Sequence, residues 1–281
     1  MIGPFGKSPK VSHHARAVVP GAGRGIGAAF AVELARRGSR VVCSDIDEVA
    51  AKRTVAAIHD IGGDAIAIGC DVTQFDAVQD LATQSQSWFG AEPTLVINNA
   101  GVGSGGARIG ELPIEDWQWV LGINLWGPIH GCHVFAPILR AGNSDVPRGI
   151  INVASAAAFG AAPSMAAYNV SKAGALSLSE TLAAELSGSG VKVTVLCPTF
   201  VKTNILESGR ISSETNQFAH KIMRWTGVSA DKVAQTCLDA HDRGDLYCMP
   251  QLEAKFGWGI KRLLPGTYTR AVGLVTRIAP L

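Results

Sequence analysis

The sequence lacks the cysteine spacing of zinc sites and of small disulfide-rich folds. Its six cysteines are scattered, and none forms a Cys-x-x-Cys pair. We therefore expect buried free thiols in a reducing compartment, and we predict a cytoplasmic location. The residues are Cys43, Cys70, Cys132, Cys197, Cys237 and Cys248.

A surplus of charge of either sign is also missing. The chain has 25 Lys and Arg residues against 23 Asp and Glu residues. Proteins that bind nucleic acid usually carry a strong basic excess, so we expect no nucleic-acid partner. Hydrophobic residues make up 47% of the 281 residues, which allows a large buried core and suits one α/β domain.

Long apolar runs without helix breakers are absent as well. Residues 149–171 carry no charge, but glycine, proline, asparagine and serine interrupt them. A membrane-spanning helix needs about 20 predominantly apolar residues, so this stretch does not predict one. The N-terminal sequence MIGPFGKSPKVSHHAR lacks the apolar core of a signal peptide.

Short apolar runs alternate with segments of helical periodicity. Several runs are apolar on both faces, as parallel strands covered by helices on both sides are. The alternation predicts a doubly wound α/β fold. Predicted strands are 15–19, 40–45, 64–70, 94–98, 149–154, 192–197 and 246–249. Predicted helices are 28–37, 48–61, 76–89, 117–139, 166–186 and 230–243.

We expect a single domain across residues 1–281, with a flexible leader at 1–14 and a basic apolar extension at 251–281. The extension has five basic residues and one acid, Glu253. Such a segment could lie on a membrane surface. We favour packing on the domain or on a neighbouring subunit, because no strict 3.6-residue stripe persists past Pro265. The basic residues are Lys255, Lys261, Arg262, Arg270 and Arg277.

Glycines cluster in the stretch VVPGAGRGIG, residues 18–27, between a predicted strand and a predicted helix. A helix start of this kind exposes free N–H groups and a positive dipole end, which suit a pyrophosphate. Asp45 closes the second predicted strand 24 residues beyond Gly21, near the spacing of a ribose-binding carboxylate. The pattern predicts a dinucleotide-binding loop.

Asp45 also bears on the choice of cofactor. A carboxylate there can accept hydrogen bonds from both ribose hydroxyls, and it would repel a 2′-phosphate. Arg24 could pair with that phosphate, but the next basic residues after Asp45 are only Lys52 and Arg53. NAD is therefore favoured over NADP.

Several motifs, taken together and in order, resemble the short-chain dehydrogenase/reductase family. The spacing Gly-x-x-x-Gly-x-Gly begins at Gly21, and Tyr168-x-x-x-Lys172 begins 13 residues after Ser155. The resemblance runs from about Ala15 to about Pro250. The other motifs that carry it are Asp71-Val72, Asn98-Asn99-Ala100-Gly101, Asn124-Leu-Trp-Gly127, Cys197-Pro198 and Thr203.

The resemblance implies a Rossmann-type, doubly wound parallel sheet of seven strands in the order 3-2-1-4-5-6-7, with helices on both faces. It also implies a homodimer or homotetramer that pairs through the helices around 117–139 and 166–186. It places the following residues at the cofactor: Gly21, Gly23, Arg24, Gly25, Ile26, Gly27, Asp45, Asp71, Val72, Asn98, Asn99, Ala100, Gly101, Tyr168, Lys172, Pro198 and Thr203.

Tyr168 and Lys172 are four residues apart and therefore share one face of a helix. A free tyrosine titrates near pH ~10, and a nearby ammonium lowers that pKa, as an oxidised nicotinamide would. We expect Tyr168 to take the proton of an alcohol, while the Ser155 hydroxyl holds the same oxygen. By resemblance, Asn124 holds a water that links the lysine to solvent.

Two positions depart from the family pattern. Pro20 stands where a threonine usually ties the first strand to its surroundings, and it removes a hydroxyl and an N–H. We expect a lost tether rather than lost phosphate donors, because those come from later residues. Thr199 replaces the usual glycine after Pro198 and adds bulk near the nicotinamide.

The expected activity is hydride transfer between NAD(H) and a secondary alcohol or ketone. The segments 156–164 and 200–228 are apolar, which predicts a bulky apolar substrate resembling a steroid, terpenoid or lipid. A catalytically weak dinucleotide-binding regulator or scaffold is the alternative. The Tyr-x-x-x-Lys spacing disfavours an enoyl reductase or epimerase. His130 and His133 share a helix face, but no third ligand is evident, so we expect no metal.

Overall fold

The computed structural model describes residues 10–143, 145–203, 209–212, 216–217, 223 and 227–278. Its main sheet contains seven parallel strands in the order β11-β7-β6-β4-β1-β2-β3. Counted along the chain, these strands run 3-2-1-4-5-6-7 across the sheet, which confirms the predicted order. The strands are β1 Arg16–Pro20, β2 Arg40–Asp45, β3 Asp64–Gly69, β4 Leu95–Asn98, β6 Arg148–Val153, β7 Val191–Leu196 and β11 Tyr247–Cys248.

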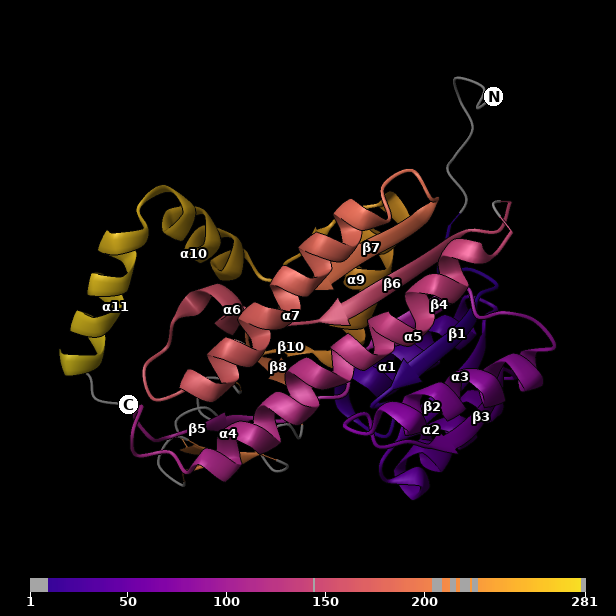
Figure 1. Cartoon of the computed structure of the whole chain (residues 1–281), viewed down its shortest axis with the longest axis horizontal. Helices are drawn as coiled ribbons and strands as arrows, with labels where there is room; N and C mark the ends of the chain where they lie inside the picture. The colour runs from indigo at the N-terminus through magenta and orange to yellow at the C-terminus, as the bar shows by residue number, and fades with distance from the viewer. Residues whose placement is uncertain are drawn as a thin grey trace.

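Helices cover both faces of this sheet (Figure 1). One layer contains α1 Gly25–Arg36, α2 Glu48–Asp60 and α9 Ala230–Arg243, and the other α3 Phe75–Phe89, α5 Gly127–Ala141 and α7 Ala166–Glu185. Strand β1 shows why its sequence is apolar throughout: Ala17 and Val19 join the core under the first layer, and Val18 joins the core under the second. The two-faced burial confirms the doubly wound fold.

The helix predicted over 117–139 is interrupted. The chain forms α4 Ile114–Leu121, a π-helical turn at Gly122–Trp126, and then α5. The Gly127 N–H donates to the Gly122 carbonyl, which is the wider bond of a π-helix. Pro128 has no N–H to give to the Asn124 carbonyl, so the α-helical pattern cannot continue there.

The two ends of the chain extend the domain. Val11 and Ser12 are buried, and the Ser12 hydroxyl donates to Asp242 at 2.7 Å, so this part of the predicted leader at 1–14 packs on the domain. Residues 1–9 lie outside the described part. At the other end, α10 Leu252–Leu263 and α11 Pro265–Ile278 form a pair of helices far from β3 (Figure 1).

Short elements gather beyond the carboxyl ends of the sheet strands. Two small ladders pair distant segments, β5 with β9 and β8 with β10, and a single turn, α6, precedes α7. All six cysteines are buried and free, which confirms the expectation from their spacing. No helix among the described residues is long and apolar enough to cross a membrane. The short elements are β5 Ser104–Gly105, α6 Ala157–Gly160, β8 Val201–Lys202, β9 Arg210–Ile211 and β10 Val228–Ser229.

Candidate active site

The glycine loop joins β1 to α1, and its glycines are required by close packing. A Cβ at Gly21 would lie 2.6 Å from the Cα of Ala100, and a Cβ at Gly27 would lie 2.0 Å from the Gly21 carbonyl oxygen. Gly21 and Gly25 also have φ values of +76° and +57°, which other residues rarely adopt. The loop therefore depends on glycine for its shape.

Helix α1 starts at this loop with its first N–H groups free of side-chain caps. Arg24 is the N-cap residue, its side chain makes no capping hydrogen bond, and the first turn has no acid. The Arg24 guanidinium instead lies 3.9 Å from the Asp47 carboxylate. The unpaired N–H groups and the helix dipole together form a site suited to a phosphate. Ile26 packs its side chain against the core.

Asp45 lies beside the glycine loop at the end of β2. Its Oδ2 accepts a hydrogen bond from the Gly23 N–H at 2.9 Å, and its Oδ1 accepts one from the Asp47 N–H at 3.0 Å. A Cβ at Gly23 would lie 2.7 Å from Oδ2. Each carboxylate oxygen can accept a further bond, so the group remains able to receive two hydroxyls.

The turn after β4 connects the glycine loop to the predicted catalytic residues. The Asn99 side-chain amide donates to the Gly21 carbonyl at 2.8 Å, and Ala100 packs on Gly21. A Cβ at Gly101 would lie 3.2 Å from Asn124 Oδ1 and 3.4 Å from Lys172 Nζ. One turn therefore touches both parts of the site.

Asn98 has a different environment from the residues that follow it. Its side chain is buried and donates to Asn152 Oδ1 at 2.8 Å, which ties β4 to β6 inside the core. A Cβ at Gly131 would lie 2.1 Å from Asn98 Oδ1, so α5 packs tightly against this amide. The described contacts of Asn98 are structural, and a contact with a cofactor stays a prediction.

Tyr168, Lys172 and Ser155 come together at the carboxyl end of β6. The Lys172 Nζ lies 5.8 Å from the centre of the Tyr168 ring and donates to the Val153 carbonyl at 3.0 Å. Ser155 follows β6, accepts a hydrogen bond from the Ala157 N–H at 3.2 Å, and contacts the Tyr168 phenol. The structure thus assembles the three predicted side chains from a strand end and one helix face.

Burial dominates the acid–base properties of this cluster. It raises the pKa of Tyr168, against a smaller lowering by the hydrogen bond from Ser155. It also lowers the pKa of Lys172 to about 8. The expected lowering of the Tyr168 pKa is therefore absent from the protein alone, because desolvation of the phenolate outweighs its favourable contacts.

Asn124 lies in the π-helical turn and is fully buried. Its Oδ1 accepts from the Val102 N–H and its Nδ2 donates to the Val102 carbonyl, both at 2.8 Å. The Nδ2 also lies 3.4 Å from the Ser171 hydroxyl, next to Lys172 on α7. Asn124 therefore fixes the segment after Gly101 against the catalytic helix, while its side chain is occupied by these partners.

The remaining predicted cofactor residues lie around the same strand ends. A Cβ at Gly25 would lie 3.3 Å from Thr203 Cβ, so Thr203 borders the glycine loop. The Pro198 carbonyl accepts a hydrogen bond from the Ala156 N–H at 2.9 Å. Asp71 Oδ1 accepts from the Thr73 N–H at 2.9 Å.

Val72 is buried near the start of α5. A Cβ at Gly127 would lie 2.9 Å from its Cγ2, and its carbonyl lies 2.9 Å from His130 Nδ1. His130 and His133 also contact the Phe75 ring, each with 5.5 Å between ring centres. Within the described part of the chain, no group of three or more His, Cys, Asp or Glu side chains could hold a metal ion.

The predicted substrate segments are described in part. In segment 156–164, Ala161 and Ser164 have φ values of +54° and +59°, a strained conformation that is common at functional sites. In segment 200–228, Phe200 is partly exposed and Met223 is buried. The other apolar residues on which the prediction rested lie outside the described residues: Ile205, Leu206, Phe218, Ile222 and Trp225.

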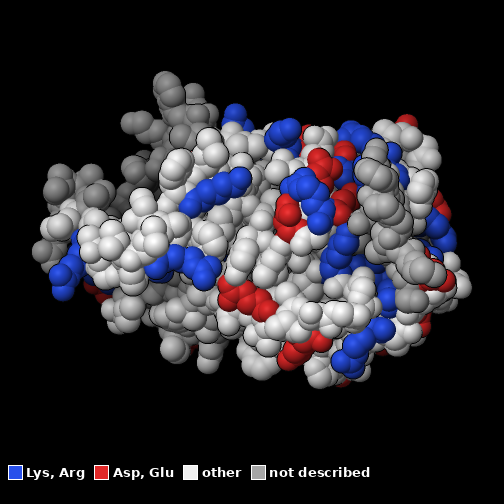
Figure 2. All heavy atoms as spheres, turned by 90° about the horizontal axis from the view of Figure 1, so that it is seen from above, with Lys and Arg blue, Asp and Glu red and all other residues white. Residues whose placement is uncertain are grey.

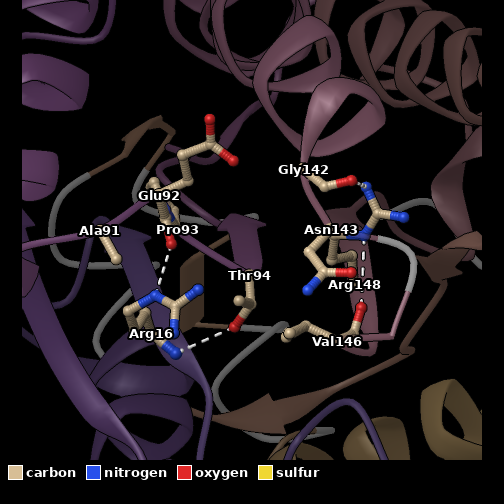
Figure 3. Close-up of a pocket in the computed structure, with 9 residues that line it drawn as sticks. All are labelled: Arg16, Ala91, Glu92, Pro93, Thr94, Gly142, Asn143, Val146 and Arg148. Atoms are coloured by element: carbon tan, nitrogen blue, oxygen red, sulfur yellow. Dashed lines mark hydrogen bonds between the residues drawn. The ribbon is translucent and has the colours of Figure 1, made fainter.

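A cavity of about 300 Å³ lies at the opposite end of the sheet, at the starts of β1, β4 and β6 (Figure 3). Arg16 and Arg148 line it, and both donate hydrogen bonds to main-chain carbonyls. None of the predicted site residues lines this cavity. The chemistry-bearing side chains are therefore separated from it by the length of the strands.

Comparison with known proteins agrees with this geometry. A family model described as short chain dehydrogenase matches residues 15–213. The chain belongs to the short-chain dehydrogenase family. Its sheet order is the one that the resemblance implied.

Relatives of this short-chain dehydrogenase include longer proteins. The probable oxidoreductase EphD of Mycobacterium tuberculosis is 36% identical over 261 residues, which cover 88% of this chain and 43% of the relative. The chain thus spans less than half of that relative's length. The 1-deoxy-11-beta-hydroxypentalenate dehydrogenase of Streptomyces avermitilis is 33% identical, over 85% of each chain. A solved short-chain dehydrogenase/reductase from Burkholderia phymatum, in complex with NAD, has a TM-score of 0.82 and 33% identity, covering 92% of this chain and 95% of that chain.

The structure shows how this short-chain dehydrogenase accommodates Pro20. The β1–β2 pairing reaches Pro20, but the β1–β4 pairing ends at Val18. The Asn99 amide, which binds the Gly21 carbonyl, lies 3.5 Å from the Pro20 carbonyl. A side chain from the β4 end thus ties the end of β1 where the family's threonine is missing.

Thr199 is held by residues that the sequence argument missed. Gln251 Oε1 accepts from the Thr199 N–H at 3.1 Å, and Gln251 Nε2 donates to the Phe200 carbonyl at 3.2 Å. The Thr199 hydroxyl donates to Glu253 at 2.9 Å. The start of α10 therefore clamps the segment after Pro198. In the sequence, the only indication of this contact was that threonine replaces the family's usual glycine at Thr199.

Proposed function

We propose that this short-chain dehydrogenase transfers a hydride between NAD(H) and a secondary alcohol or ketone. The observation that carries the proposal is the cluster of Ser155, Tyr168 and the buried Lys172 beside an uncapped glycine loop. A phenol and an ammonium on one helix face, next to a fixed hydroxyl, suit proton transfer at a carbinol oxygen.

The loop fits a nicotinamide dinucleotide. We propose that the free N–H groups at the start of α1 hold the pyrophosphate and that the two oxygens of Asp45 accept the ribose hydroxyls. A bound nicotinamide would accept or return the hydride. Because Arg24 pairs with Asp47 and Asp45 adds negative charge beside the ribose site, NAD is favoured over NADP.

Tyr168 would exchange the proton with the substrate oxygen. Its raised pKa favours the phenol, which can protonate a forming alkoxide in the direction of reduction. For alcohol oxidation the phenol must lose its proton, and the Lys172 ammonium nearby stabilises the phenolate electrostatically. Ser155 would orient the substrate oxygen through its hydroxyl, and Asn124 would position the segment behind Lys172.

A bulky apolar substrate remains our proposal for specificity. Phe159 in segment 156–164 and Met223 in segment 200–228 are buried, and Phe200 is exposed by 36%. Apolar lining with few polar groups suits an apolar ligand whose reacting oxygen meets the polar cluster. The related pentalenate enzyme carries a hydroxyl in its substrate name, which supports an alcohol substrate.

We also propose a cytoplasmic homodimer or homotetramer. Trp126 and Val170, at the predicted pairing helices, are 54% and 48% exposed in the single chain. Large apolar side chains on helix faces often lie in subunit contacts. Sedimentation equilibrium would test the assembly, and a Trp126→Glu variant should dissociate it.

The decisive test of the activity is Tyr168→Phe. Absorbance at the nicotinamide band would be followed with NAD and NADP separately, against a panel of apolar alcohols and ketones. We expect Tyr168→Phe to lower turnover by about 10²–10⁴-fold, the usual contribution of a general acid or base. Tyr247→Phe is the matched control, because its hydroxyl binds Glu180 on the surface.

Retention of most turnover by Tyr168→Phe would contradict the assignment of proton transfer. A wild-type protein that binds NAD but turns over no alcohol or ketone in the panel would instead favour the regulator or scaffold. Equal or better use of NADP would overturn the role proposed for Asp45.

A further inference from the structure

Helix α10 has two opposite faces that differ in their surroundings. On the inner face Ala254 is buried, and the Trp258 ring packs on Tyr247 with 5.3 Å between ring centres. The outer face carries four large apolar side chains spaced by four, four and three residues, which places them on one stripe. They are Leu252, Phe256, Ile260 and Leu263, exposed by 67%, 68%, 51% and 81%.

Positive charge borders this stripe. Helical geometry places Lys255 and Arg262 along one flank, and Arg270 is exposed on α11. Glu253, the single acid in residues 251–281, receives the Thr199 hydroxyl and is thereby drawn toward the domain. Figure 2 shows this end of the molecule, at the left, as a broad surface free of charge with blue side chains beside it. The stripe is therefore apolar in its centre and cationic at its edge.

The two helices also lie beside segment 156–164, one of the two proposed substrate segments. The Tyr268 hydroxyl of α11 donates to the Gly160 carbonyl at 3.2 Å, and α10 packs against α6. Both contacts fall on the apolar segment 156–164. A surface that covers the stripe would consequently lie close to the segment that we propose contacts an apolar substrate.

We propose that α10 and α11 dock this protein on an anionic lipid surface. The apolar stripe would enter the boundary between headgroups and acyl chains, and the flanking cations would meet the lipid phosphates. The proposal goes beyond the proposed oxidoreductase activity and does not depend on it. The absence of a stripe after Pro265, which favoured packing in the sequence argument, does not weigh against this arrangement, because the exposed stripe lies on α10.

A second copy of the chain fits the stripe less well. In a symmetric pair the same surface meets itself, so α10 would lie against α10 of the partner. In an antiparallel pair the flank with Lys255 and Arg262 would then face its own copy, and like charges at such a contact are unfavourable. An anionic surface complements the same flank without this repulsion.

Flotation with lipid vesicles tests the proposal on the full chain. Vesicles of phosphatidylcholine alone would be compared with vesicles of equal parts phosphatidylcholine and phosphatidylglycerol. Leu263→Glu places an acid in the stripe, and Ile61→Glu is the matched control, because Ile61 is exposed on the domain away from α10. Lys255→Gln with Arg270→Gln tests the charges. Circular dichroism verifies the folding of every variant.

We expect wild type and Ile61→Glu to float with the anionic vesicles only, and added salt to weaken the binding. Leu263→Glu should abolish flotation. The double variant Lys255→Gln, Arg270→Gln should bind the anionic vesicles more weakly, by about fivefold for each cation removed. Failure of wild type to float, or flotation unchanged in Leu263→Glu, would overturn the proposal. A third result would also overturn it: wild type binds no vesicles but forms an oligomer, and Leu263→Glu dissociates that oligomer. A second copy of the chain would then cover the stripe.

Discussion

Two buried cations stand at opposite ends of strand β6 and have opposite surroundings. Arg148 begins the strand, and Lys172 of α7 donates to Val153 at its end. Each is only 3% exposed. Burial alone therefore does not distinguish the two, and the difference lies in how far each is hydrogen-bonded.

Arg148 is well supplied with acceptors. It donates to the carbonyls of Leu139 and Gly142 at the end of α5, and to those of Val146 and Ser189 (Figure 3 shows Gly142 and Val146). A cation at a helix C-terminus also interacts favourably with the helix dipole. Its charge is therefore committed to holding α5 and β6 together.

Lys172 has three N–H donors, and among the described residues they have one main-chain acceptor, the Val153 carbonyl at 3.0 Å. Burial without an acid partner lowers its pKa to about 8. A buried cation that has N–H donors to spare and lies next to a phenol is suited to assist proton transfer. A buried cation that donates to many carbonyls has a structural role.

The largest expected effect separates the two cations by activity. Lys172→Met should lower turnover about 10³-fold, because Tyr168 loses its positive neighbour. Lys192→Met is the matched control, since Lys192 also donates to a main-chain carbonyl but outside the site. Steady-state assays at the nicotinamide band measure both. Similar losses of turnover in Lys172→Met and Lys192→Met would contradict a specific role of Lys172 in the reaction.

The next effect separates the cations by stability. Arg148→Met should lower the free energy of unfolding by about 4 kcal/mol, because several buried carbonyls lose their donor. Turnover per folded molecule should not change. Denaturant unfolding measures the loss, with the exposed Arg140→Met as control. A stable Arg148→Met variant would show that these bonds contribute little.

The third effect is a pH dependence of stability that arises from Lys172. Its pKa is about 8 when folded, against an ordinary 10.5, so the unfolded chain holds the proton more tightly. The cost of burying the charge is fully present below pH 8 and is relieved between 8 and 10.5. Lys172→Met should therefore be more stable than wild type at neutral pH, by up to about 3 kcal/mol.

That stability difference should shrink as the pH rises above 8, because the wild type then loses the buried charge. Parallel denaturant titrations of the two proteins at several pH values measure it. Titrations of groups far from Lys172 cancel between the two proteins. A difference that is constant with pH would contradict the lowered pKa.

The smallest effect concerns the tether at the glycine loop. Asn99→Ala removes the hydrogen bond to Gly21 and should weaken NAD binding about fivefold, the worth of one ordinary hydrogen bond. Pro20→Thr should leave the affinity unchanged, because Asn99 already ties the end of β1. Asn143→Ala at the opposite end is the control. Calorimetry measures all three, and markedly tighter binding by Pro20→Thr would show a compromised loop.

Local patterns were enough to predict the framework. The helix predicted at 230–243 coincides with α9, and the strand predicted at 40–45 coincides with β2, because apolar runs and their glycine ends are encoded within each segment. The proximity of Tyr168 to Lys172 followed from their spacing on one helix. The family resemblance supplied the sheet order, which no local pattern contains.

Contacts between distant residues could not be predicted. The π-helical turn at Asn124 depends on Pro128 and on Val102, which lies 22 residues before Asn124. The clamp of Gln251 on Thr199 joins residues 52 apart. The raised pKa of Tyr168 depends on burial by the whole fold, which the spacing of Tyr168 and Lys172 in the sequence does not encode.

The titration of Lys172 itself is the most direct measurement of the contrast between the two buried cations. Nuclear magnetic resonance of protein labelled at the lysine Cε, with Lys172→Met to assign the signal, would follow its charge in the protein without cofactor. We expect a midpoint near 8, well below the other lysines. A midpoint at the ordinary 10.5 would contradict the claim that burial lowers the pKa of this ammonium.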